Sequence, residues 1–86
     1  MINLQNNPKE WATLMYELED AKEHLEDLIN TMNSQENIDE VNYEINLGHI
    51  FAHLNRAWNS RNTIGEYTDK TRSIISAFPK DIEPCG

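Results

Sequence analysis

The fold is decided by residues 11–32, which read WATLMYELEDAKEHLEDLINTM. Apolar side chains recur in this stretch at alternating intervals of three and four positions: Trp11, Leu14, Leu18, Ala21, Leu25, Leu28 and Met32. Because an α-helix turns once every 3.6 residues, this spacing places all seven side chains on one stripe. A helix with a single apolar stripe packs against another helix. The stretch therefore predicts an all-α fold.

Signals at both ends limit this first helix. Asn7 is a typical N-cap, Pro8 suits the first helical position, and Glu10 stands where it would complete a capping box. The polar run NSQEN at residues 33–37 is typical of a turn between helices. We therefore expect a helix over about residues 8–33.

A second helix is expected over about residues 38–60, because residues 37–40 form another capping-box pattern. Two long helices joined by so short a turn run antiparallel, as a helical hairpin. The second helix has two apolar stripes on roughly opposite sides: Ile38, Val41, Ile45, Gly48 and Ala52 in the first, and Leu47, Phe51, Leu54 and Trp58 in the second. We expect the first stripe to meet the first helix, with Gly48 and Ala52 allowing close approach, so the second stripe needs another cover.

Two arrangements would cover the second stripe. Weak helix formers at residues 59–63 predict a break, after which Thr63 to Glu66 form a third capping box and open a short helix over about 64–77. Its apolar residues would then fold back on the stripe: Ile64, Tyr67, Ile74, Ile75 and Phe78. Alternatively, the second helix continues through Gly65 and pairs with another copy in a four-helix bundle. We favour the break, followed by an extended tail over 79–86.

Composition narrows the possible functions. The chain has 86 residues, a length that predicts a single domain over 1–86. Its net charge of −8 argues against nucleic-acid binding, since phosphate contacts need clustered Lys and Arg. Residues 1–45 carry eleven acids against two bases, whereas residues 46–80 carry five bases against two acids. The two halves can attract each other within one chain or across two copies. A solvated acidic face that keeps the protein soluble explains the same charge.

Compartment signals are few. Residues 1–7 lack the basic start and apolar core of a signal peptide, and no apolar run approaches membrane-spanning length. The single cysteine, Cys85, cannot form an intramolecular disulfide, which is consistent with a reducing compartment. We expect a cytoplasmic protein that does not bind membranes.

The histidines offer two interpretations. His49 and His53 are four positions apart, share a helical face and could chelate a transition metal, with His24 brought near them by the hairpin. The Glu-x-x-His pairs of di-iron bundles and the His-Glu-x-x-His motif of zinc proteases are absent from the sequence. We therefore interpret the residues as partly buried, hydrogen-bonded histidines, with no metal ligand and no cofactor assigned. Metal or small-ligand binding through the His49/His53 face is the alternative.

A polar seam runs along the second helix between its two apolar stripes: Asn42, Asn46, His49, His53, Arg56 and Ser60. Polar groups flanked by apolar surface are typical of interfaces. The seam predicts either a register-fixing contact in a homodimer or recognition of another protein or a small anion. Beside it, Arg56, Trp58 and Arg61 have the composition of a binding hot spot.

Motifs for catalysis are missing from the sequence, which has no Gly-rich phosphate loop and no nucleophile elbow. We expect a non-enzymatic helical interaction or oligomerisation module that forms a homodimer. The predicted interaction surface comprises Leu47, His49, Phe51, His53, Leu54, Arg56, Trp58 and Arg61. A further hypothesis is that the acidic first helix mimics a polyanion and blocks a nucleic-acid-binding protein.

Overall fold

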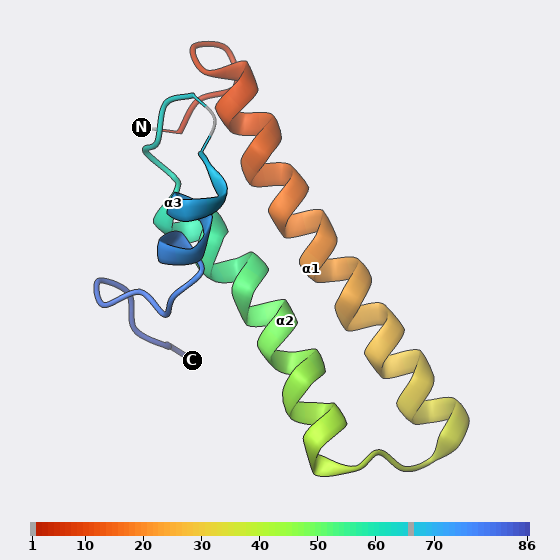
Figure 1. Ribbon diagram of the computed structural model, residues 1–86. Coiled ribbons are helices and arrows are strands. Elements are labelled where there is room, and N and C mark those ends of the chain that lie inside the picture. Colours follow the sequence, from red (N-terminus) through yellow and green to blue (C-terminus); the bar gives the residue numbers. More distant parts are fainter. Residues whose placement is uncertain (1, 66) are drawn as a thin grey trace.

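The chain folds as a helical hairpin with a short third helix. The computed structural model describes residues 2–65 and 67–86 and contains α1 (Pro8–Gln35), α2 (Glu40–Asn59) and α3 (Asp69–Ile75). The first two helices run antiparallel, and α3 lies beside the C-terminal end of α2 (Figure 1). The predicted all-α fold and hairpin are confirmed.

Local hydrogen bonds explain where the two long helices begin. Pro8 occupies the first position of α1, as predicted, but within the described chain the side chain of Asn7 makes no capping bond. Glu10 does not complete a capping box either, because its Oε2 accepts the backbone N–H of Gly65 at 3.3 Å. In α2 the N-cap is Asp39, whose Oδ1 accepts the backbone N–H of Asn42 at 2.9 Å. That helix therefore begins at Glu40, two residues later than predicted.

The predicted break after the second helix is confirmed, but the predicted start of the third helix is wrong. α2 ends at Asn59 and α3 begins only at Asp69. Gly65 has φ +86°, in the left-handed region, so no right-handed helix can run through it. The N-cap is Thr68, whose Oγ1 accepts the backbone N–H of Thr71 at 3.4 Å. Glu66, the last member of the predicted capping box, lies outside the described residues.

The core between α1 and α2 is thin. Among the described residues, the buried apolar side chains are Leu14, Ala21, Leu28 and Ile50. Leu18 and Leu25 belong to the predicted stripe but are 45% and 43% exposed. The line of α1 that faces α2 passes instead through Glu17 and His24, which keep the same spacing of three and four. Polar side chains thus alternate with apolar ones along the centre of the contact.

The prediction for the first stripe of α2 is wrong for most of its residues, although Ile38 packs against the buried core. Val41 and Ile45 are 64% and 63% exposed, and no described atom lies within 4 Å of where a Cβ would stand at Gly48. α2 instead turns the part of its polar seam that holds His49, His53 and Arg56 toward α1, and buries His53 and Arg56 there. The physical reason is polar satisfaction, because the buried carboxylate of α1 needs donors that an apolar stripe cannot supply.

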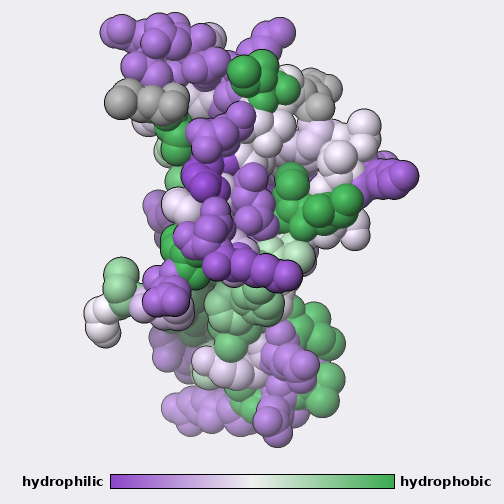
Figure 2. Space-filling model, turned by 90° about the vertical axis from the view of Figure 1, so that its left-hand side faces the viewer, coloured by the Kyte–Doolittle hydropathy of each residue, from purple (hydrophilic) through white to green (hydrophobic). Residues whose placement is uncertain are grey.

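The second stripe of α2 is covered in part by the segment after α3. The ring of Phe78 lies 5.5 Å from that of Phe51, and Nε1 of Trp58 donates to Asp81 at 2.9 Å. Ile64 and Ile74, which were predicted to join this cover, are exposed. Residues 79–86 form neither helix nor strand, as predicted. Figure 2 shows hydrophobic side chains still on the surface of the lower half, separated by polar ones.

The molecule is elongated. Its radius of gyration is 14.8 Å and its longest extent is 46 Å, whereas a compact domain of this length has a radius of gyration of about 12 Å. Much of each helix is therefore uncovered. None of the three described helices is both long and apolar enough to cross a membrane.

Candidate metal centre

The three histidines of the chain meet at one point between α1 and α2. His24 comes from α1, whereas His49 and His53 come from successive turns of α2. The Nε2 atom of His49 lies 3.1 Å from Nε2 of His24 and 3.3 Å from Nε2 of His53. One ring nitrogen from each residue belongs to a set within 4.8 Å of one another. The hairpin thus gathers three imidazoles that could act as ligands.

The two spacings that involve His49 suit ligands of a tetrahedral metal ion. A Zn–N bond to histidine is about 2.0–2.1 Å long, so two ligands at the tetrahedral angle stand about 3.3 Å apart. One hydrogen bond cannot serve both contacts of His49, because each ring nitrogen offers one in-plane position, either a donor or an acceptor. Nε2 of His49 faces two neighbours with that single position. A cation at the centre would accept a lone pair from all three rings.

The surroundings favour the neutral form of His49. Partial removal from water lowers the pKa of His49 below its ordinary value of 6.5, and electrostatic repulsion from His24, His53 and Arg56 lowers it further. The carboxylate of Asp20 opposes this effect. A depressed pKa keeps the imidazole neutral near neutral pH, which is the form that binds a metal ion.

A buried carboxylate lies behind the histidines. Glu17 of α1 is 3% exposed, and its Oε2 accepts a hydrogen bond from Nε of Arg56 at 3.0 Å. The same oxygen lies 2.9 Å from Nδ1 of His53. Histidines that bind a metal through Nε2 typically donate the Nδ1 hydrogen to a carboxylate, which fixes the ring and its tautomer. Glu17 is therefore placed to hold His53 with its Nε2 lone pair toward the cluster.

The other oxygen of Glu17 binds the C-terminal part of the chain. Oε1 accepts the hydroxyl hydrogen of Tyr67 at 3.2 Å and lies 3.9 Å from Nη2 of Arg72. Burial, and then the charge of Glu17, raise the pKa of Tyr67 above 10.0. The tyrosine thus remains a hydrogen-bond donor through the whole physiological range.

Solvent reaches the histidine cluster from one side. His24 and His49 are exposed, whereas His53 is buried against Glu17. Three protein ligands with an open position differ from the closed four-ligand sites that only hold a fold together. Water or an external ligand would complete the coordination of a bound ion.

The predicted interaction residues divide between two places. The structure puts three in the hairpin interface: His49, His53 and Arg56. Four others line grooves along α2, namely Leu47, Phe51, Leu54 and Trp58, and of these Leu47 also packs against the buried core. Arg61 follows that helix, where its guanidinium stacks 3.7 Å over the Trp58 ring and binds Asp81 at 3.1 Å. The predicted surface is therefore not continuous.

The sequence patterns did not predict a role in the site for two of its residues. Glu17 was not singled out, although it falls on the same helical line as Leu14, Ala21 and His24, which was the available signal. Tyr67 was expected to cover the second stripe of α2, but its hydroxyl instead meets Glu17.

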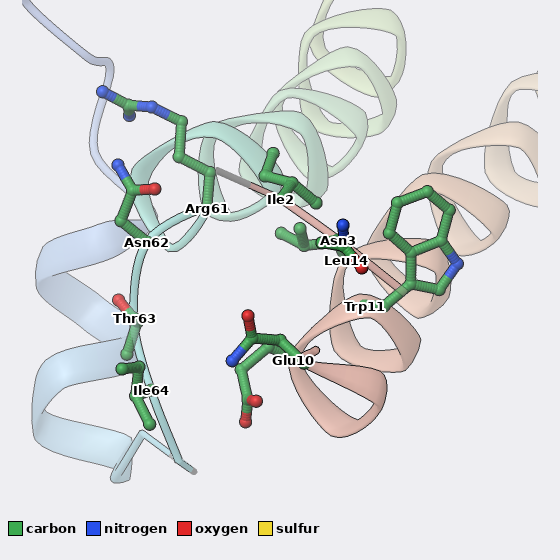
Figure 3. Close-up of a pocket in the computed structure, with 10 residues that line it drawn as sticks. Ile2, Asn3, Glu10, Trp11, Leu14, Arg61, Asn62, Thr63 and Ile64 are labelled. Atoms are coloured by element: carbon green, nitrogen blue, oxygen red, sulfur yellow. The ribbon is translucent and has the colours of Figure 1, made fainter. Parts of the chain in front are cut away.

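A separate pocket of about 130 Å³ opens near the N-terminal end of α1, between the N-terminal segment and the loop after α2 (Figure 3). Its lining comprises Ile2, Asn3, Asn7, Glu10, Trp11, Leu14, Arg61, Asn62, Thr63 and Ile64. Both of its charged groups are already engaged: Glu10 accepts from the backbone of Gly65, and Arg61 binds Asp81. The pocket is thus a weaker candidate than the histidine cluster.

No family model, curated protein or solved structure matches this chain. Function is therefore inferred from the residues themselves. Among the described residues, the three histidines backed by Glu17 are the group with the most specific chemistry.

Proposed function

We propose that the protein binds one divalent transition-metal ion, of the zinc type, through His24, His49 and His53. The observation that carries the proposal is the convergence of their ring nitrogens from two helices, at spacings of 3.1 and 3.3 Å. Imidazole suits zinc, copper and nickel, and a tetrahedral arrangement favours zinc. The contact between Glu17 and Nδ1 of His53 supports the same assignment.

The ion would strengthen a hairpin that has little core of its own. His24 belongs to α1 and the other two ligands to α2, so a bound ion links the two helices directly. Metal binding adds stability to small domains with few buried apolar side chains, because the ion binds the folded state. An ion that binds only the folded state stabilises it by about 2.7 kcal/mol at a free concentration one hundred times the Kd.

Titration with Co²⁺, followed by displacement with Zn²⁺, tests the proposal. The wild-type chain should give the visible absorption of tetrahedral cobalt and saturate at one ion per chain. His49→Ala removes an exposed ligand without disturbing the buried Glu17 contacts, and should weaken binding at least tenfold.

The matched control addresses non-specific binding by a chain of net charge −8. Glu26→Gln removes an exposed carboxylate of α1 that pairs with Lys22 at 3.9 Å, away from the cluster. This variant should bind cobalt like the wild type. Equal loss in both variants, or equal binding by wild type and His49→Ala, would contradict a histidine site.

We also propose self-association, as a non-enzymatic module, because apolar side chains remain open along α2. Two grooves of about 490 and 370 Å³ are lined in part by Leu47, Phe51, Leu54 and Trp58. The larger grooves lie among residues other than the three histidines, which favours a binding module over an enzyme. The proposal includes the cytoplasmic location expected from the sequence, which the lone exposed Cys85 supports.

Light scattering after gel filtration tests self-association. The wild type should have the mass of a dimer, and Leu54→Asp should have that of a monomer with unchanged helical content. Leu25→Asp is the matched control, since Leu25 is 43% and Leu54 is 42% exposed. A monomeric wild type, or an equal effect of both substitutions, would exclude this surface.

A further inference from the structure

Glu17 is the point where all three helices are joined. Its Oε2 contacts His53 and Arg56 of α2 at 2.9 and 3.0 Å. Its Oε1 binds Tyr67, just before α3, at 3.2 Å, and lies 3.9 Å from Arg72 within α3. One carboxylate thus connects the histidine cluster to the C-terminal segment.

α3 is held in place mainly by polar contacts. None of its seven residues, all of which the structure describes, is buried. Asn55 donates to the carbonyl of Ser76 at 2.9 Å, and Asn59 donates to that of Ile75 at 2.6 Å. Arg56 adds a hydrogen bond from Nη1 to Oγ of Ser76 at 2.8 Å. An element with few buried contacts opens locally at low free energy, so its docking responds to small changes.

His53 has one ring nitrogen in each network. Its Nε2 lies 3.3 Å from His49, whereas its Nδ1 lies 2.9 Å from Oε2 of Glu17 and 3.0 Å from Nη2 of Arg56. With hydrogen on Nδ1, the ring donates to Glu17. With hydrogen on Nε2, the Nδ1 lone pair accepts from Arg56 and repels the carboxylate. The two tautomers therefore favour different arrangements around Glu17.

A metal ion on Nε2 selects the first tautomer, because that nitrogen must supply its lone pair. The Nδ1 hydrogen then holds Oε2 of Glu17 in place. With this oxygen fixed, Oε1 stays positioned for Tyr67 and Arg72. Occupancy of the cluster and docking of α3 thus depend on the same carboxylate.

We infer that metal binding at the three histidines strengthens the docking of α3 through Glu17, so that the C-terminal segment responds to the ion. This inference rests on the proposed metal site. Phe78 follows Ser76 by two positions and covers Phe51, with ring centroids 5.5 Å apart. Loss of the ion therefore loosens the cover of the apolar face of α2 that we propose for self-association.

Hydrogen exchange of the wild-type chain with and without Zn²⁺ tests the coupling. The informative amides are those of Arg72 and Ser76, which bond to the carbonyls of Thr68 and Arg72. Zinc should slow their exchange on the order of tenfold, within the usual range of coupling between sites. The amide of Glu36, at the far end of the hairpin, serves as an internal reference.

Tyr67→Phe separates the coupling from general stabilisation. It removes the hydroxyl bond to Glu17 while leaving the three histidines intact. The effect of zinc on the α3 amides should be largely lost in this variant, and reciprocity requires its zinc affinity to fall by a similar factor. Tyr43→Phe, an equivalent change on α2 away from Glu17, should respond like the wild type.

The outcomes distinguish the coupling from the metal site. If zinc binds but the α3 amides are unchanged, or are slowed equally in Tyr67→Phe, the coupling is refuted and the site stands. If zinc fails to bind the wild-type chain, the site and the coupling fall together.

Discussion

Replacing Glu17 by leucine should destabilise the fold strongly. Glu17 is 3% and Arg56 is 7% exposed, and they meet at 3.0 Å. Without the carboxylate, the guanidinium is buried with no counter-charge, which costs about 3–5 kcal/mol. A chain of this length has a total unfolding free energy of roughly 4–13 kcal/mol. Since each kcal/mol lowers the Tm of a small domain by about 4–8 °C, the Tm should fall by at least about 12 °C.

The double variant Glu17→Leu, Arg56→Met tests the reason for this loss. It removes both charges, and apolar replacements of a buried pair are often neutral or stabilising by about 1–4 kcal/mol. His53 and Tyr67 each lose a hydrogen bond to Glu17, worth about 1 kcal/mol apiece. Ser76 loses the hydrogen bond that it accepts from Arg56, but its hydroxyl keeps the one that it donates to the carbonyl of Arg72. The double variant should therefore lie within about 2 kcal/mol of the wild type.

Urea unfolding followed by circular dichroism, with chelator present, measures both effects. Glu19→Leu, an exposed acid of the same helix, is the control and should change stability by less than about 0.5 kcal/mol. The reasoning is refuted if Glu17→Leu unfolds at the wild-type urea concentration. It is refuted equally if the double variant is as unstable as the single one.

Three further predictions concern pH and capping. The pKa of His49 is depressed in the folded state, so this group contributes stability that is present above pH 6.5 and is lost as pH falls through its folded pKa. In urea unfolding with chelator present, His49→Gln should therefore reduce the loss of unfolding free energy at acid pH. The pKa of Tyr67 is raised, so its contribution to the unfolding free energy is present below pH 10 and is lost as pH rises through the folded pKa. In Tyr67→Phe, this loss of stability at alkaline pH should be absent, and an unfolding curve like that of the wild type would argue against the Glu17 contact. Asp39→Ala removes the N-cap bond to Asn42 and should lower the unfolding free energy by about 1 kcal/mol, whereas Asn37→Ala, which does not cap α2, should lower it less.

Local sequence signals predicted the helices well because they depend on neighbours in the chain. The periodicity of residues 11–32 and the polar run after them placed the first helix within two residues of its observed end at Gln35. The third helix was misplaced because both Thr63 and Thr68 are suitable N-caps. The left-handed backbone of Gly65 excludes a helix that begins at Thr63. The sequence alone does not predict this, because glycine permits a left-handed conformation but does not require it.

The facing sides of the helices could not be predicted from hydrophobicity alone. The heptad favoured Leu18 and Leu25, yet the contact line runs through Glu17 and His24. This choice depends on the pairing of Glu17 with Arg56, which lies 39 positions away. Glu17 is one of eleven acids in the first half of the chain, and nothing local separates a buried carboxylate from solvated ones. Only the spatial arrangement of its partners does so.

The candidate site was predicted in part. Hairpin geometry suggested that His24 approaches the His49/His53 face, and the structure brings all three together. The interpretation as hydrogen-bonded histidines also holds for the Nδ1 side of His53. The convergence of three Nε2 atoms required the register of the hairpin, which depends on contacts distant in sequence.

Nuclear magnetic resonance of the imidazole nitrogens during a zinc titration tests the central claim most directly. At one ion per chain, the Nε2 signals of His24, His49 and His53 should shift together and then stop changing, while Nδ1 of His53 keeps its hydrogen. A shift of fewer than three rings, coordination through Nδ1 of His53, or continued change beyond one equivalent would contradict the account.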